Sequence, residues 1–271
     1  MARVGVFYSI GFFLLMGVFL LFTFVVLKES RFTNERLTDD VALVKIHSLD
    51  ESIQKSFRDL FFLTSGISLS TSANSLTFME VLPNVQNTSF KNNLSLFKQF
   101  IESNYSVTFN TTEIANNLSL FVNPYGIRFT HLSYGGKTLK VFYDTTNFAG
   151  FNLTLTVTVP LNVNSCTSTG TSSNPYLSVT AVGSTGSCSR TDITQLTLLD
   201  TNTPQNVLAR VSLGGKTLNV TYLREQSLTV AVVVSNLNLL NESVTVTTVE
   251  NVLRYTYPDF GFAKNGTIRV L

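Results

Sequence analysis

An uncharged apolar segment near the N-terminus, Val4 to Leu27, constrains this chain more than any other feature. The segment is rich in Phe, Leu and Val, and as a helix rising about 1.5 Å per residue it would cover the roughly 30 Å of a bilayer core. A cleaved signal peptide has a shorter apolar region that ends at small residues, whereas this segment ends in Val25-Val26-Leu27. The sequence therefore predicts an uncleaved transmembrane anchor over residues 1–28, with the lipid bilayer as the partner of residues 4–27.

Two signals disagree about the side of the membrane on which the remaining chain lies. Basic residues are more numerous after the apolar segment than before it, which favours a cytoplasmic C-terminal domain. Low charge, a Thr-rich composition and nine Asn-x-Ser/Thr sequons favour the opposite side. The glycosylation candidates are Asn87, Asn93, Asn104, Asn110, Asn117, Asn152, Asn219, Asn241 and Asn265. We give the second group more weight and predict a single-pass membrane protein with an extracytoplasmic C-terminal domain.

Charge and residue usage disfavour several classes of function. Only 13% of the residues are charged, and 19 Lys and Arg face 17 Asp and Glu, so the chain lacks the basic footprint of a nucleic-acid-binding protein. Two His, two Cys and no Trp leave few of the side chains that build metal centres, acid-base sites and sugar platforms. We therefore expect no nucleic-acid partner, no cofactor, no metal site and no enzymatic activity, and nothing identifies a surface ligand.

Residues 29–104 are predicted to form a helical stalk and a linking segment. Between Glu35 and Phe61, apolar residues recur every three or four positions on one helical face, and a second short helix is expected over Ser89–Ser103. The stripe of stalk interface candidates consists of Ala42, Ile46, Leu49, Ile53, Phe57 and Leu60. Either the chain's own β domain covers this stripe, which we favour, or neighbouring stalks cover it by self-association.

Beyond residue 105 the pattern changes to period-two alternation with β-branched residues, which indicates a β-sandwich or barrel. The overall prediction is mainly β, α+β in class, with a sandwich that follows the helices. The expected strands are Ser106–Asn110, Leu118–Val122, Ile127–Ser133, Thr138–Asp144, Asn152–Val159, Tyr176–Val182, Ile193–Leu199, Val207–Ser212, Thr217–Leu223, Ser227–Val234, Val244–Val249, Val252–Tyr257 and Thr267–Leu271.

An internal repeat refines this picture, because residues 133–143 match residues 212–222 at eight of eleven positions. A Gly-Gly pair between alternating segments is typical of a two-residue hairpin turn, so Gly135, Gly136, Gly214 and Gly215 are assigned to turns. Two related β units follow, over 105–190 and 191–271. A phosphate loop is disfavoured, because His131 and Arg210 occupy the position where its first Gly is required.

The predicted turns also determine which residues pair across each hairpin, and so which residues lie on each face of its strands. With a Gly214-Gly215 turn, Val211 faces Leu218 on an apolar face, and Arg210 lies on the polar side. The first copy then places His131 on its polar face, opposite Lys140.

Cys166 and Cys188 each lie among Ser, Thr and Gly residues in a turn-rich region. In an oxidising compartment two such cysteines pair, and closing this loop is worth about 3 kcal/mol on the chain-entropy model. The alternative is two unrelated buried thiols.

The apolar segment, which contains Phe7-Tyr8-Ser9-Ile10-Gly11-Phe12-Phe13-Leu14-Leu15, is followed by a stalk and then by an Asn/Thr-rich β domain. This order of parts resembles archaeal single-span surface proteins and, more loosely, type IV pilin-like proteins. The resemblance extends over the layout of the whole chain. It implies a non-catalytic surface protein with a structural or adhesive role. The alternatives are a subunit of a pilus-like filament and an anchored extracytoplasmic enzyme or solute-binding domain.

Overall fold

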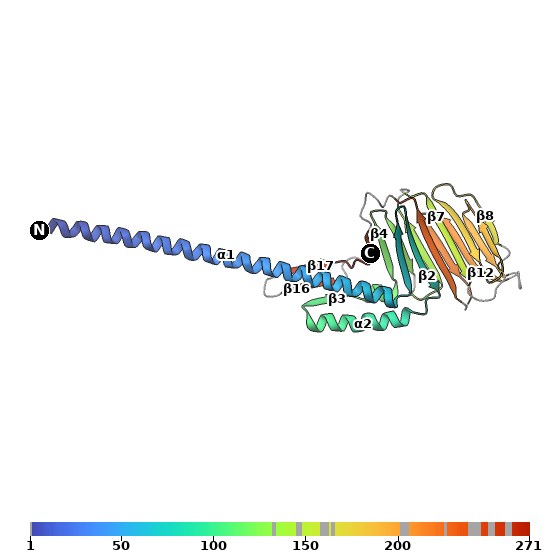
Figure 1. Cartoon of the computed structure of the whole chain (residues 1–271), viewed down its shortest axis with the longest axis horizontal. Coiled ribbons are helices and arrows are strands. Elements are labelled where there is room, and N and C mark those ends of the chain that lie inside the picture. The colour runs from blue at the N-terminus through green and yellow to red at the C-terminus, as the bar shows by residue number, and fades with distance from the viewer. Residues whose placement is uncertain are drawn as a thin grey trace. The chain divides into compact units, whose positions relative to one another are not determined.

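The computed structural model describes most of the chain (Figure 1). The described part excludes residues 1, 132–133, 145–147, 158–162, 164–165, 201–205, 225–226, 238–244, 249–252 and 258–261. It also excludes the side chains of residues 2–15, 17, 30–43, 257 and 262–264. The chain divides into two compact units, Met1–Ser52 and Ile53–Leu271.

The first element, α1, is one continuous helix over Ala2–Thr64. No Gly or Pro occurs between Lys28 and Thr64, so no residue breaks the helix after the apolar segment. It ends where Gly66 adopts a positive φ of 70°, the conformation that commonly terminates a helix. In the part of the chain that the structure describes, no helix is long and apolar enough to cross a membrane. This finding contradicts the transmembrane anchor predicted over residues 1–28.

A small aromatic core joins the end of α1 to α2 (Asn87–Asn104) and β3 (Val107–Phe109). Phe57 lies with its ring centroid 6.1 Å from that of Phe109 and 6.5 Å from that of Phe97, and Phe61 meets Phe90 edge to face. The predicted helix Ser89–Ser103 is thus present and slightly longer. Figure 1 shows α2 beside the last turns of α1.

Polar contacts fix β3 against α2. The Lys98 ammonium group donates to the Phe109 carbonyl, and the Phe109 N–H donates to Glu102 Oε1 over 2.8 Å. Partial burial raises the pKa of Glu102, but these hydrogen bonds and the Lys98 charge outweigh burial and hold the pKa below its usual value.

Most strands belong to two sheets that form a sandwich. The six-stranded sheet has the order β1-β2-β14-β7-β9-β10, the eight-stranded sheet β15-β4-β5-β6-β13-β12-β11-β8, and a small sheet β17-β16-β3. In the six-stranded sheet the strands are β1 Ile67–Ser72, β2 Ser75–Leu82, β14 Leu228–Ser235, β7 Gly150–Val157, β9 Tyr176–Val182 and β10 Ser187–Arg190. In the eight-stranded sheet they are β15 Thr245–Thr247, β4 Ser119–Asn123, β5 Ile127–His131, β6 Thr138–Tyr143, β13 Thr217–Tyr222, β12 Val207–Gly214, β11 Gln195–Leu199 and β8 Cys166–Thr169. The remaining elements are α3 Thr112–Asn116, β16 Leu253–Tyr257 and β17 Phe262–Gly266.

The core lies between the two large sheets, where aromatic side chains meet across the gap. Phe78 of β2 stacks on Phe129 of β5 with ring centroids 4.5 Å apart, and Tyr143 of β6 contacts Phe151 of β7. Alternate residues of β6 and β14 point inward, which is the burial pattern that period-two alternation predicts.

A disulfide joins the two sheets at one edge. Cys166 lies on β8 and Cys188 on β10, and these are the terminal strands of the eight-stranded and six-stranded sheets. The Cα atoms are 6.2 Å apart. The predicted pairing is confirmed, and the bond links the two sheets of the sandwich covalently at this edge.

The repeat has a structural meaning different from the one predicted. Its two copies supply β6 and β13, which lie side by side and antiparallel with Lys140 opposite Asn219. Asn219 is the residue equivalent to Lys140 in the repeat, so a local twofold axis relates the copies within one sheet. The prediction of two separate β units, 105–190 and 191–271, is wrong, because β14 from the second segment pairs with β7 from the first and with β2.

The turn of the second copy is Gly215-Lys216, whose φ angles are 56° and 61°. Both residues of a type I′ turn need positive φ, and Gly214 ends β12 opposite Thr217. The predicted Gly214-Gly215 turn is therefore one residue out of register. The faces were nevertheless assigned correctly, because Val211 and Leu218 are buried while Ser212 and Asn219 lie on the outer side.

The first copy departs from the second because Tyr134 leaves the strand. Its N–H donates to the Asn116 carbonyl and its hydroxyl to the Ser65 carbonyl, so His131 pairs with Leu139 instead of the predicted Lys140. An odd shift of register exchanges the faces of a strand. His131 is consequently buried, whereas its repeat equivalent Arg210 points outward, and the prediction of an exposed His131 is wrong.

Candidate functional site

The outer face of the eight-stranded sheet carries a polar surface with two hollows. Along β11, β12 and β13, buried apolar residues alternate with polar residues that point away from the sandwich. The register aligns the outward residues into rows across the strands. Gln195, Ser212, Asn219 and Lys140 form one row, and Thr197, Arg210, Thr221 and Thr138 form the next.

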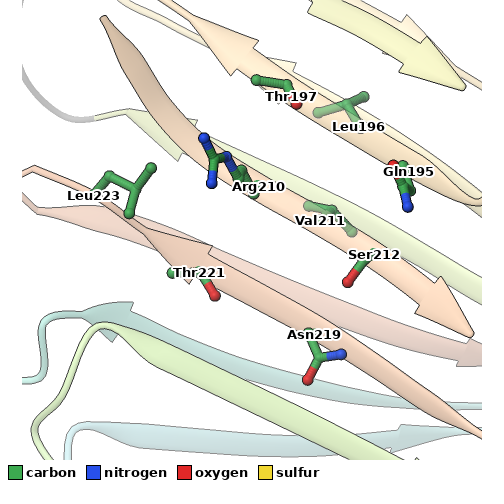
Figure 2. A pocket seen from close by; sticks show the side chains of 9 residues that line it. All are labelled: Gln195, Leu196, Thr197, Arg210, Val211, Ser212, Asn219, Thr221 and Leu223. Atoms are coloured by element: carbon green, nitrogen blue, oxygen red, sulfur yellow. The ribbon is translucent and has the colours of Figure 1, made fainter.

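The first hollow, which we call the Arg210 groove, lies over β11, β12 and β13 and has a volume of about 310 Å³. Figure 2 shows Arg210 between Thr197 on one side and Thr221 and Leu223 on the other. The groove is lined by Gln195, Leu196, Thr197, Arg210, Val211, Ser212, Asn219, Thr221 and Leu223. It combines one cation with several short hydroxyl and amide groups.

A second hollow, of about 330 Å³, lies over β4, β5 and β6. Its cation, Arg128, is already engaged, because the guanidinium lies 4.5 Å from the centroid of the Phe142 ring and 5.6 Å from that of Phe121. Asp144 also lines this hollow. Its charges are therefore more nearly balanced than those of the Arg210 groove.

The other notable polar cluster is buried between the sheets. His131 Nε2 of β5 lies 2.7 Å from Glu80 Oε2 of β2, although the two atoms lack the directional geometry of a hydrogen bond. Asn84 donates to Glu80 Oε1 and to the Ser65 carbonyl, each over 2.8 Å. Burial, and secondarily the Glu80 charge, raises the pKa of the adjacent Tyr134 phenol.

This cluster has the side chains of an acid-base pair but not the access. The Glu80 and His131 side chains are 0% and 2% exposed, so a substrate could not reach them in this conformation. The cluster instead links β2, β5 and the end of α1. It is best understood as a polar contact within the core.

The sequons differ in how accessible their side-chain amides are. Asn104, Asn110, Asn117 and Asn265 are exposed, and Asn93 and Asn219 are half-buried. Asn152 donates to Tyr176 Oη and to Ser235 Oγ, and Asn87 donates to the Tyr134 carbonyl. Asn241 lies outside the described residues. A glycan on Asn87 or Asn152 would have to disrupt these contacts in the folded chain.

The predicted stalk stripe divides between the two units. Ile53 and Phe57 are buried within the second unit, and Leu60 is half-buried there. In the first unit Ile46 is buried and Leu49 half-buried, while the side chain of Ala42 lies outside the described residues. The C-terminal part of the stripe thus packs within the second unit.

Of the predicted turn glycines, Gly135 and Gly215 have the positive φ that a turn requires. A Cβ atom at Gly135 would lie 2.2 Å from Asn87 Nδ2, so this position also needs a glycine for close approach to α2.

Among the described side chains, no three His, Cys, Asp or Glu residues lie close enough together to hold a metal ion. No protein-family model matches the chain, and no curated protein or solved structure is significantly similar to it. The function must therefore be inferred from the site itself. Sequence reasoning named Arg210 as an outward residue and Asn219 as a sequon, but it did not bring them together with Gln195 and Thr197. The pairing of β11 with β12 and of β12 with β13 brings these residues together, and a local sequence pattern does not reveal that pairing.

Proposed function

We propose that this protein is a non-catalytic, extracytoplasmic protein with a structural or adhesive role, which presents the outer face of its eight-stranded sheet to a partner. The observation that carries this proposal is the Cys166–Cys188 disulfide between the terminal strands of the two sheets.

The disulfide favours an oxidising compartment for this protein. Structural disulfides form and persist in oxidising compartments and are rare in the cytosol. Cys166 and Cys188 are 5% and 6% exposed, which is typical of a structural bond and not of a redox-active one. Exposed sequons at Asn104, Asn110, Asn117 and Asn265 and the low charge of the chain agree with an extracytoplasmic setting.

The proposed absence of catalysis rests on how the titratable groups are arranged. The closest His-carboxylate pair, Glu80 and His131, is enclosed in the core. The Arg210 groove holds a cation and neutral groups, which suits binding, and its lining contains no carboxylate or imidazole that could act as a base on its Ser and Thr hydroxyls.

Protease treatment of intact producing cells tests the location. We expect cleavage of the exposed chain without lysis, and non-reducing peptide mapping should recover residues 166 and 188 in one linked peptide. Protection of every site until lysis, together with free Cys166 and Cys188 thiols, would contradict the proposal. A cytoplasmic protein of known accessibility serves as the lysis control.

A second candidate function, a subunit of a filament, is favoured by one observation on α1. Large apolar side chains are exposed all round one segment of this helix, with exposures from 47% to 71% over Val18–Phe22 and Phe24–Leu27. A helix that is apolar on every side is normally buried among other apolar groups. Copies of the same helix could provide that cover.

Electron microscopy and sedimentation of the full chain test this second candidate. Leu21→Glu with Phe24→Glu should abolish assemblies, because the introduced charges could not be buried between helices. Lys45→Glu, which changes an exposed charge on the same helix, is the matched control. A native chain that sediments as a monomer at all concentrations would exclude the filament.

A further inference from the structure

We propose that the Arg210 groove is a binding site for an acidic carbohydrate, with Arg210 pairing with a sugar carboxylate and the surrounding hydroxyl and amide groups hydrogen-bonding to the sugar ring. This inference rests on the proposed adhesive function and gives it a ligand class.

The charge at the centre of the groove has no partner among the residues that the structure describes. Arg210 is exposed, and it forms no hydrogen bond or ion pair with any residue that the structure describes. Arg224, which follows the end of β13, is by contrast held near Asp200 at 3.7 Å. A guanidinium presents a planar pair of donors that matches a carboxylate in two parallel hydrogen bonds. Arg210 is therefore available to an anionic group from outside.

The rest of the groove offers neutral donors and acceptors at fixed positions. Thr197 and Thr221 face Arg210 from the two adjacent strands, and Ser212 lies between Gln195 and Asn219 in the neighbouring row. Each of these groups can both donate and accept a hydrogen bond, as a ring of sugar hydroxyls requires. Leu223 adds an apolar edge against which the C–H groups of a sugar could lie.

The electrostatics of the whole sheet favour an anion. None of its eight strands contains Asp or Glu, whereas they carry Arg128, Lys140 and Arg210. Lys140 lies two strands from Arg210, roughly 10 Å away at about 4.8 Å per strand spacing. A second acidic group further along a glycan would meet this lysine.

The same face disfavours other polyanions. A nucleic acid needs many phosphate contacts for affinity, and three cations spread over the sheet supply few. An acidic peptide would ordinarily bind through a free strand edge or apolar pockets, whereas this groove lies on the face of paired strands and is lined mainly by hydroxyl and amide groups. Its volume of about 310 Å³ is at the lower end for ligand pockets, which fits one or two sugar rings.

Glycosylation would compete with this ligand. Asn219 lines the groove, and a glycan on its side-chain nitrogen would lie over Ser212 and Thr221. The inference therefore requires Asn219 to be unmodified in the active protein. Production in a host without N-glycosylation leaves Asn219 unmodified and keeps the groove residues unchanged.

Isothermal titration calorimetry on the full chain with tetragalacturonate, an oligomer of uronic acid, tests the site. We expect binding that weakens at least about tenfold, or 1.4 kcal/mol, in Arg210→Gln and that is only partly restored in Arg210→Lys, because an ammonium group keeps the charge but cannot form the paired hydrogen bonds of a guanidinium. A neutral tetragalactose of the same length should bind at least about tenfold more weakly. Arg128→Gln, in the second hollow, is the matched control and should leave the affinity unchanged.

Three outcomes would overturn the inference. They are equal affinity for the acidic and neutral oligomers, loss of binding in Arg128→Gln but not in Arg210→Gln, and displacement by sulfate at equal concentration, which would indicate a general anion site. Absence of any binding by native-sequence protein that is folded by circular dichroism and carries an unmodified Asn219 by mass spectrometry would also reject it. Surface protease accessibility would remain intact in all these cases, so failure of this inference is distinguishable from failure of the proposed function.

Discussion

Removing one member of the buried pair between the sheets should cost far more than a typical substitution. His131→Ala leaves the Glu80 carboxyl group in the core with Asn84 as its remaining polar partner, and both Glu80 and His131 side chains are almost fully buried. Leaving Glu80 without His131 costs about 3 kcal/mol, because the remaining polar group is desolvated without compensation and the deleted imidazole leaves a cavity. We therefore expect His131→Ala to lower the free energy of unfolding by about that amount.

The two residues should also be coupled. A double variant, Glu80→Leu with His131→Leu, removes both polar groups and replaces them with apolar side chains that suit the surrounding core. It should be more stable than His131→Ala, with a coupling energy of about 1–3 kcal/mol in the double-mutant cycle built from Glu80→Leu and His131→Leu. Simple additivity would mean that the two side chains do not interact.

Urea unfolding of the full chain, followed by far-ultraviolet circular dichroism, provides the measurement. With a slope of about 2–3 kcal/mol per molar urea, a loss of 3 kcal/mol moves the midpoint down by about 1–1.5 M. Glu113→Gln, on an exposed residue of α3, is the control and should stay within about 0.5 kcal/mol of the native protein. A change below about 1 kcal/mol for His131→Ala would refute the reasoning, because it would show that the cluster is hydrated or not formed.

Three further predictions use the same unfolding assay. Gly215→Val should cost about 1–3 kcal/mol because φ is 56° at this position, whereas Gly214→Val should be nearly neutral because its φ is not positive and open space surrounds it; equal effects would place the turn elsewhere. Cys188→Ser should lower the free energy of unfolding by about 3 kcal/mol, because the unfolded chain loses the loop that the disulfide closes over a separation of 22 residues. If reduction of the native protein left the unfolding midpoint unchanged, the disulfide would not contribute this stability. Glu102 has a lowered pKa in the folded chain, so its stabilisation is present above the unfolded pKa of about 4.3 and is lost as pH falls through the lower folded value; Glu102→Gln should flatten the decline in the midpoint between pH 7 and pH 3, and an unchanged slope would exclude its role.

The local sequence determined much of the secondary structure and the disulfide. The strand Tyr176–Val182 has the predicted bounds, and the helix Asn87–Asn104 differs by two residues at its start and one at its end. These elements follow from periodicity, which depends only on neighbouring residues. Strands with weaker patterns, such as the Ser-rich β1 and the short β8 and β10, were not predicted, because pairing with neighbours and not local propensity stabilises them.

Tertiary structure alone decided the partners and faces that matter for function. The repeat identified two similar segments, but only the pairing of β6 with β13 shows that they form one continuous sheet. Tyr134 leaves its strand to reach Asn116 and Ser65, and the resulting odd register shift turns His131 inward toward Glu80, while its equivalent Arg210 stays outside in the groove. Residues with the same place in a repeat thus acquired opposite environments, because side-chain direction in a strand depends on the register set by distant contacts.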